Sequence, residues 1–274
     1  MKEHLKCRLK NNFALRAIIK PYIDVKRYID LINYQKSADS EYMKSLKNTH
    51  INERCFIIGN GPSLKAEDLD KLCGEFCFAS NRIFNIFDRT KWRPTVYLAV
   101  DNSFIDESGK ELNKYELDNL FLGVGKKFDI SKIKGRVTRI FEYTKFKINK
   151  WSDCSAFISE DVSRFFSVGY TVTFTAIQLA LYMGFKEIYL LGVDFSYSVV
   201  RDKYGKIHVD NSIKDYFWGE KYSSTVLSYD ANLNAYKKAR DYAETHKIKI
   251  YNATRGGHLE VFERIDFDNI DYDI

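Results

Sequence analysis

Residues 54–64 read RCFIIGNGPSL, a short apolar run followed directly by a glycine turn. Arg54–Gly59 has the continuous apolar texture of a buried strand, and a helical pattern over Leu64–Leu72 begins as soon as the turn ends. Gly59 and Gly61 allow a sharp bend and a close approach of the backbone. A strand, a tight turn and a helix in this order predict one unit of an α/β sheet.

The turn itself has two interpretations. Pro62 lacks an N–H that a helix start does not need, Ser63 can cap the helix, and a helix N-terminus attracts phosphate. The spacing differs from the dinucleotide fingerprint because Leu64 stands where the third glycine would be, and no Walker Lys-Ser/Thr pair follows. The sequence therefore predicts that residues 59–63, including Asn60, hold a phosphate, or that they form a plain strand-to-helix connection.

After residue 51 the chain alternates short apolar runs with amphipathic stretches, without a linker or an internal repeat. Strands separated by helices predict a mostly parallel, doubly wound α/β sheet with helices on both faces and right-handed crossovers. Residues 51–274 are therefore expected to form one domain. The expected strands are 75–79, 95–100, 120–124, 136–141, 187–191 and 247–252, and the expected long helices are 171–183 and 230–246.

Composition indicates a globular protein with a large core, because 45% of the 274 residues are hydrophobic and only three are prolines. No apolar run reaches the roughly 18 residues that cross a bilayer, and the N-terminus lacks the pattern of a signal peptide, so a cytoplasmic location is expected. The five cysteines form no CxxC pair. Neither a disulfide framework nor a metal site is expected, and no resident cofactor is predicted.

All of the excess positive charge lies in residues 1–50, which hold eleven Lys/Arg and five Asp/Glu, a net +6, whereas residues 51–274 carry 32 of each sign. A neutral domain disfavours nucleic-acid binding. Apolar residues in 1–50 recur at roughly helical spacing interrupted by Pro21, which predicts one or two basic amphipathic helices. Such a segment could lie on the anionic inner face of a membrane, pack on its own domain, or contact a second copy.

Polar residues follow the predicted strands and open the helix at 171. Because the carboxyl ends of parallel strands share one edge of a sheet, these residues should converge on one crevice with the glycine turn. Taken singly, each could instead be a turn residue that satisfies local backbone groups. The residues expected at the crevice beyond the turn are Asn81, Asp101, Asn102, Thr171, Thr173, Gly192 and Asp194.

Three motifs occur in order along the chain: IIGNGPSL at 57–64, TVTFTAIQLALYMGFKEIYLLGVDFSY at 171–197 and KIKIYNATRGG at 247–257. They resemble the bacterial sialyltransferases of glycosyltransferase family 42 and their relatives, the Maf-type flagellin glycosyltransferases and the MptE-like domain family. The resemblance spans residues 54–257. It implies a Rossmann-like fold, a donor that is a nonulosonic acid activated by cytidine monophosphate (CMP), inversion at the anomeric carbon and no metal.

The resemblance also implies roles by position within these motifs. Asn60 and Ser63 would lie against the nucleotide phosphate or the sugar. Asn81 and the pair Asp101-Asn102 would lie against the donor.

The resemblance also implies which residues lie near the charged groups of the donor. Thr171 and Thr173 would contact the donor carboxylate and the cytidine, and Asp194 closes the GxDF motif. Tyr197 and Tyr204 would place their hydroxyls on the departing phosphate.

The general base is the point where this sequence departs from the sialyltransferases. They carry a histidine just before the last helix, whereas this chain has Asp230 there. His208 is a second candidate because it has the matching chemistry, and His258, after the NATRGG turn, is a third. Asp230 could instead cap the helix, and His208 could be a surface residue.

Residues 203–229 are dense in aromatic and basic residues without helical or strand periodicity. An irregular segment of this length in a compact domain is usually functional or disordered, and we interpret it as a lid. Tyr216, Phe217 and Trp218 could stack on a sugar or a base, or anchor the lid to the core.

Three hypotheses remain open. The first is a metal-independent glycosyltransferase acting on a cell-surface glycan or a lipid-linked acceptor. The second is a magnesium-dependent pyrophosphokinase of the MptE-like kind, with Asp101 and Asp194 as metal ligands. The third is a noncatalytic protein that binds a nucleotide sugar.

Overall fold

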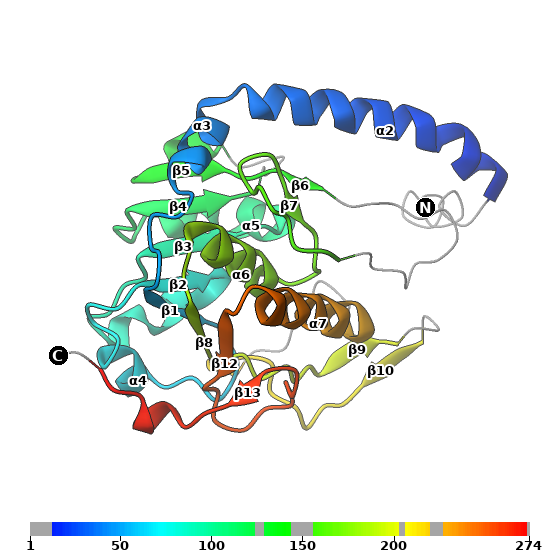
Figure 1. Ribbon diagram of the computed structural model, residues 1–274. Helices are drawn as coiled ribbons and strands as arrows, with labels where there is room; N and C mark the ends of the chain where they lie inside the picture. Colours follow the sequence, from blue (N-terminus) through cyan, green and yellow to red (C-terminus); the bar gives the residue numbers. More distant parts are fainter. Residues whose placement is uncertain (1–12, 124–128, 144–155, 203–205, 220–226, 273–274) are drawn as a thin grey trace.

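The computed structural model describes residues 13–123, 129–143, 156–202, 206–219 and 227–272, without the side chains of residues 13–20 and 23. Its centre is an eight-stranded sheet in which every neighbouring pair runs parallel, in the order β13-β12-β8-β1-β2-β3-β4-β5 (Figure 1). The predicted α/β fold is confirmed. The strands are β1 Arg54–Ile58, β2 Cys77–Ser80, β3 Val96–Ala99, β4 Asn119–Leu122, β5 Arg136–Arg139, β8 Glu187–Leu191, β12 Lys249–Asn252 and β13 Glu263–Arg264.

The strand order reverses between β1 and β8. From β1 the chain adds β2 to β5 on one side, and it then returns to add β8, β12 and β13 on the other. Connections that leave two neighbouring strands in opposite directions open a crevice at the carboxyl ends of those strands. The pairing of Ile58 with Leu191, continued by the bond from Gly59 N–H to Leu191 O at 2.8 Å, brings the two turns after β1 and β8 side by side.

Helices cover both faces because strand residues alternate in direction. Ile57 of β1 belongs to one core, together with residues of α3 (Ala38–Ser45), α6 (Val172–Met183) and α7 (Tyr229–Thr245). Phe56 and Ile58 belong to the opposite core, with residues of α4 (Ala66–Asp70), η1 (Asn81–Arg89) and α5 (Asn102–Leu112). Ten of the twelve residues of α6 are buried, and the helix ends at Gly184, where φ is +96°.

Residues before β1 form the helices α2 (Phe13–Gln35) and α3. The predicted helical segment is therefore present, but Pro21 lies inside α2 and does not divide it. The chain after α3 is bonded to the domain, since Asn48 N–H donates to Tyr182 O at 3.0 Å and His50 N–H to Met183 O at 2.8 Å. No helix in the described ranges is long and apolar enough to cross a membrane.

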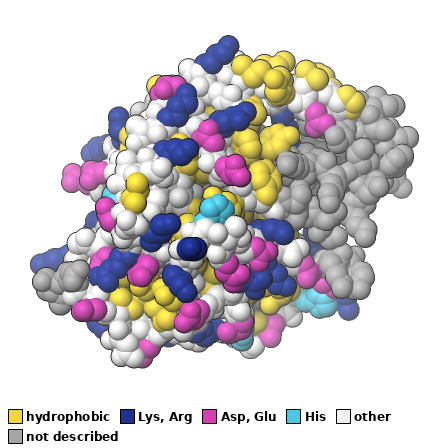
Figure 2. Space-filling model, in the orientation of Figure 1, with side chains coloured by type: hydrophobic (Ala, Val, Ile, Leu, Met, Phe, Trp, Pro, Cys, Tyr) yellow, Lys and Arg dark blue, Asp and Glu magenta, His cyan; other side chains and the backbone are white. Residues whose placement is uncertain are grey.

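The middle of α2 exposes large apolar side chains. Tyr22, Val25, Tyr28 and Ile29 are more than half exposed, and apolar side chains gather along this helix in Figure 2. The C-terminal end of α2 contacts the domain, since the Tyr34 hydroxyl donates to Arg139 O at 3.1 Å. Only part of this helix is thus packed on its own domain.

The segment expected to be an irregular lid contains short strands. Between β8 and α7 lie β9 (Val199–Arg201), β10 (Ile207–Val209) and β11 (Leu227–Ser228), paired in the order β10-β9-β11. Strands of two or three residues are too short to show a periodic sequence pattern, which is why the expectation of no strands was wrong. A further short pair joins β6 (Glu142–Tyr143) to β7 (Phe166–Ser167). Short 3₁₀ helices complete the chain, η2 at Ile130–Lys132 and η3 at Phe267–Asn269.

Most element boundaries differ from the expected ones by a few residues, and two differences matter. The helix expected over Leu64–Leu72 spans only Ala66–Asp70, and the strand expected to be last is followed by β13. A strand of two exposed residues, Glu263 and Arg264, carries no apolar signal. Because α4 begins at Ala66 with Lys65 as its N-cap, Ser63 of the glycine turn does not cap this helix.

Candidate functional site

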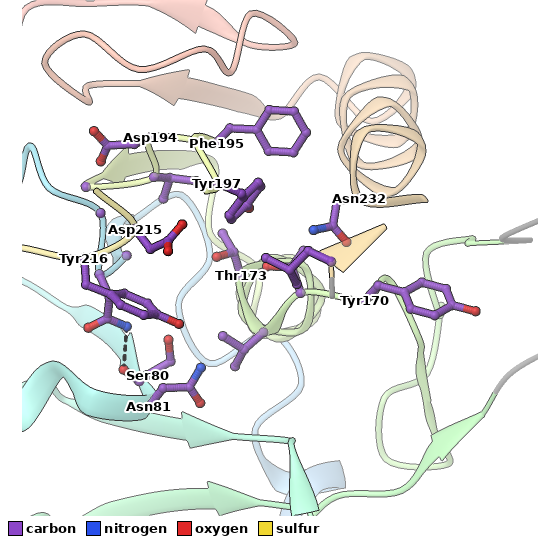
Figure 3. A pocket seen from close by; sticks show the side chains of 18 of the residues that line it. Ser80, Asn81, Tyr170, Thr173, Asp194, Phe195, Tyr197, Asp215, Tyr216 and Asn232 are labelled. Carbon is purple, nitrogen blue, oxygen red and sulfur yellow. Dashed lines mark hydrogen bonds between the residues drawn. The ribbon is translucent and has the colours of Figure 1, made fainter. Parts of the chain in front are cut away.

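A cavity of about 290 Å³ lies at the carboxyl ends of β1, β2, β3 and β8, where the strand order reverses. The turns after these strands, the N-terminus of α6 and the first turns of α7 surround it (Figure 3). The lining residues are 59–61, Ser80, Asn81, Val100, Asp101, Glu142, Val168, 170–173, 192–197, Asp215, Tyr216, Leu227, Asn232 and Tyr236.

The glycine turn is shaped by close contact with the turn after β8. A Cβ atom at Gly59 would overlap the Gly192 carbonyl oxygen, and one at Gly61 would overlap Asp194 Oδ2. The Ser63 hydroxyl donates to the same Asp194 Oδ2 at 2.7 Å. Ser63 therefore does not cap α4, whose N-cap is Lys65 and whose five residues begin beyond the turn. The two glycines are required by the packing of two turns against each other.

Three asparagines in the cavity lining have buried polar atoms without a hydrogen-bond partner among the described residues. The Asn60 amide nitrogen donates to Ser80 O at 2.9 Å, but its Oδ1 accepts no hydrogen bond. Asn81 Oδ1 and both amide atoms of the fully buried Asn232 also have none. A buried polar atom left unpaired costs about 1–3 kcal/mol. Four such atoms on one cavity indicate that it is built to bind a polar ligand.

Three residues with side chains beyond Cβ take up the left-handed backbone conformation at the cavity: Asn81 at φ +52°, Tyr170 at φ +60° and Phe195 at φ +53°. Asparagine tolerates this region, whereas aromatic residues are strained there. Backbone strain of this kind persists where the surrounding structure holds it and clusters at functional sites. The positive φ values add to the case for this cavity as the candidate functional site.

The N-terminus of α6 points into the cavity. Its N-cap Thr171 makes no side-chain capping bond. Burial raises the pKa of Tyr236 of α7, and the nearby side chains of Thr171 and Thr173 oppose this shift. The N–H groups of the first turn carry the positive end of a twelve-residue helix dipole. Such an end binds an anionic group.

Among the described residues that line the cavity, the ionisable side chains are acidic or phenolic, without a Lys, Arg or His. Asp194 is buried, which raises its pKa, while the bonds from Ser63 oppose the shift. Burial raises the pKa of Glu142 to about 7, and the nearby Asp101 carboxylate adds to the shift. Burial also raises the pKa of Tyr197, and the neighbouring Asn232 amide opposes it.

Most of the residues expected at the crevice do converge on the cavity. Pro62 and Ser63 are not among the lining residues, and Asn102 is an exposed residue of the first turn of α5. Tyr204 lies outside the described residues. The expected residues that line the cavity are Gly59, Asn60, Gly61, Asn81, Asp101, Thr171, Thr173, Gly192, Asp194 and Tyr197.

The three candidate bases lie outside the lining. His208 is exposed on β10, with Nε2 2.9 Å from Asp202 Oδ2. Asp230 is the second residue of α7, whose N-cap is Ser228. His258 is exposed, and its N–H donates to Asp194 O at 2.7 Å. Their roles as bases stay predictions.

The family model described as "6-hydroxymethylpterin diphosphokinase MptE-like" matches residues 29–200, more than half of the chain. The chain belongs to the MptE-like family. This confirms the resemblance drawn from the three motifs. No curated protein matches the sequence.

Two solved structures are similar to this MptE-like chain, both at 16% identity. One is the Maf glycosyltransferase from Magnetospirillum magneticum AMB-1, with a TM-score of 0.50 over 89% of this chain and 39% of the other. This chain thus spans about two fifths of that protein. The other is the sialyltransferase CstII from Campylobacter jejuni in complex with a substrate analogue, cytidine-5'-monophosphate, with a TM-score of 0.43 over 78% of this chain and 85% of the other. The fold of the MptE-like chain is glycosyltransferase-like and of the Rossmann type.

Several lining residues of the MptE-like chain, among them Asn232 and Glu142, were not predicted from the sequence. Asn232 carried a signal, because it is polar on a helix face whose other positions, among them Ala235, Tyr236 and Ala239, are apolar and buried. Glu142 carried none, since it belongs to a two-residue strand that only tertiary structure pairs with β7.

Proposed function

We propose that this protein is a glycosyltransferase that takes a sugar from a CMP-activated donor, with a nonulosonic acid of the sialic-acid kind as the transferred group. One observation carries the proposal: three asparagines with unpartnered amide atoms line a cavity at the carboxyl ends of the central strands. A cytosine ring, a ribose and a sugar carboxylate offer the donors and acceptors that such amides need.

The cavity can hold a phosphate without a cation among its lining residues. The α6 N-terminus supplies N–H groups, and the hydroxyls of Thr171, Thr173 and Tyr197 lie around the same space. Groups fixed in place before the reaction stabilise the charge that develops as a phosphate leaves. This arrangement supports departure of CMP, and inversion at the anomeric carbon is part of the proposal.

The proposal includes an acceptor at a membrane surface. The acceptor is a glycan or a lipid-linked sugar, and the exposed apolar stretch of α2 holds the protein at the anionic inner face of the membrane. The support is the exposure of Tyr22, Val25, Tyr28 and Ile29 on a helix that belongs to the positively charged segment 1–50.

Diphosphate transfer to 6-hydroxymethylpterin is the second candidate, favoured by the family to which the chain belongs. Such transfer uses magnesium held by carboxylates and phosphates. The carboxylates expected to serve are engaged: Asp101 caps α5 through Ser103 N–H at 2.8 Å, and Asp194 accepts from Ser63. Among the described residues no three His, Cys, Asp or Glu side chains lie close enough together to hold a metal ion. These residues do not fit a magnesium site, and we derive no step through one.

The test is the release of CMP from CMP-N-acetylneuraminic acid with water as the acceptor, in EDTA and in magnesium. A glycosyltransferase releases CMP equally in both. Transfer of diphosphate from ATP to 6-hydroxymethylpterin, seen only with magnesium, would establish the second candidate. Binding of CMP without any release would indicate a noncatalytic nucleotide-sugar-binding protein.

A further inference from the structure

We propose that Glu142 is the general base that removes the proton of the acceptor hydroxyl. This inference rests on the proposed glycosyl transfer and assigns a residue outside the three sequence motifs. The residues proposed to contact the donor keep their roles, and Glu142 acts on the acceptor in the same cavity.

Hydrogen bonds engage three of the four carboxylates among the described residues that line the cavity. Asp215 accepts from Ser198 N–H at 2.6 Å and from the Ser198 hydroxyl at 2.5 Å, so it links two parts of the segment between β8 and α7. Asp194 and Asp101 are engaged by Ser63 and by the start of α5. Glu142 is the lining carboxylate for which the described residues provide no hydrogen-bond donor. It is the one left to meet a substrate hydroxyl.

The backbone fixes Glu142 on a paired strand in the cavity lining. β6 is bonded to β7 through Phe166 N–H to Phe141 O at 2.7 Å and Val168 N–H to Tyr143 O at 3.3 Å. Shortly after β7 the chain enters α6, whose N-terminus lines the same cavity. Glu142 and the N-terminus of α6 therefore line the same cavity, with Glu142 held on a paired strand.

The pKa of Glu142 depends on the charges that face it. The lining contributes the carboxylates Asp101, Asp194 and Asp215 and the phenols of Tyr170, Tyr197, Tyr216 and Tyr236. Arg27 of α2 interacts with Tyr143, the next residue on β6. Burial and Asp101 together raise the pKa of Glu142 to about 7. A base works best when its pKa lies near the working pH, and a pKa of about 7 meets this condition.

The step balances as follows. The Glu142 carboxylate accepts the hydroxyl proton while the acceptor oxygen forms its bond to the anomeric carbon. The bond from that carbon to the phosphate oxygen breaks, and CMP leaves with the electron pair. The glutamic acid then returns its proton to solvent.

The experiment combines two measurements on the full chain. Selective ¹³C labelling of glutamate carboxyls gives the titration midpoint of Glu142 by NMR, and CMP release from CMP-N-acetylneuraminic acid gives turnover. We expect a midpoint near 7 that falls in Asp101→Asn, in which the amide still caps α5. We expect Glu142→Gln to lower turnover by about 10²–10⁴-fold while CMP affinity changes less than about threefold. Glu116→Gln, at an exposed position outside the cavity, is the matched control.

The outcomes separate the base from the function. A midpoint near the ordinary glutamate value, or undiminished turnover in Glu142→Gln, overturns the assignment of the base. A wild-type protein that neither binds CMP nor releases it refutes the proposed function, and the base with it. Low turnover in Glu116→Gln as well would show that the loss is not specific to Glu142 and would also overturn the assignment.

Discussion

Replacing Asn232 by leucine separates the stability of the fold from its function. The two side chains have nearly the same shape, and Asn232 is fully buried with neither amide atom hydrogen-bonded within 3.5 Å among the described residues. Leucine removes the cost of burying two unpaired polar atoms, each worth about 1–3 kcal/mol. Part of this gain is lost to imperfect packing, so we expect Asn232→Leu to raise the free energy of unfolding by about 1–3 kcal/mol.

A matched asparagine provides the control. Asn252 is equally buried, but its Nδ2 donates to Leu259 O at 2.8 Å and its Oδ1 accepts from Thr254 N–H at 3.0 Å. Asn252→Leu breaks both bonds and leaves two backbone groups unpaired, which should destabilise the protein by about 2–5 kcal/mol. The two variants should therefore move stability in opposite directions.

The assay is differential scanning calorimetry with and without CMP. At about 2–4 °C per kcal/mol, Asn232→Leu should melt a few degrees above wild type without ligand. Added CMP should raise the melting temperature of wild type and not that of Asn232→Leu, because ligand stabilises only a protein that binds it. An Asn232→Leu variant as destabilised as Asn252→Leu would refute the reasoning, since it would show that the Asn232 amide is paired in the folded protein.

Three further predictions concern the turn, the buried glutamate and α2. Gly61→Ala should cost at least about 2 kcal/mol in urea unfolding, because its Cβ would displace Asp194 from Ser63; an unchanged midpoint would contradict the close packing. Between pH 4.5 and 7 the unfolded chain loses the Glu142 proton that the folded chain keeps, so stability falls as pH rises. The free energy of unfolding of Glu142→Gln minus that of wild type should thus increase by about 1–3 kcal/mol from pH 5 to pH 8, and thermal melts of both proteins measure it. A stability difference that does not change with pH would argue against the raised pKa. Deleting residues 1–36 should abolish co-sedimentation with acidic vesicles. Equal co-sedimentation of the full chain and the deletion variant would show that α2 does not bind the membrane.

The sheet could be predicted because its strands are fully buried. Cys55–Ile58, Val96–Ala99 and Ile188–Leu191 are continuous apolar runs, and such runs separated by helical patterns leave few topologies. The convergence of Asn60, Asn81, Asp101 and Asp194 followed from the same rule, since all come after parallel strands.

Other features depend on contacts that sequence patterns do not encode. Ser63 looked like a helix cap because helix α4 was expected two residues earlier, and its actual partner, Asp194, lies 131 residues away. Glu142 enters the site through a two-residue strand pair. The unpaired state of Asn232 is a property of the assembled cavity and has no local signal beyond a polar residue on a buried face.

Titration of CMP into the full chain by calorimetry, in EDTA, tests the central claim most directly. We expect one CMP per chain without added metal, and affinities at least tenfold weaker in Asn60→Ala and in Asn232→Ala, because both residues line the cavity and have unpaired amide atoms. Equal affinity of the wild type and both variants would place the nucleotide elsewhere. No binding of CMP, together with magnesium-dependent binding of ATP, would contradict the account.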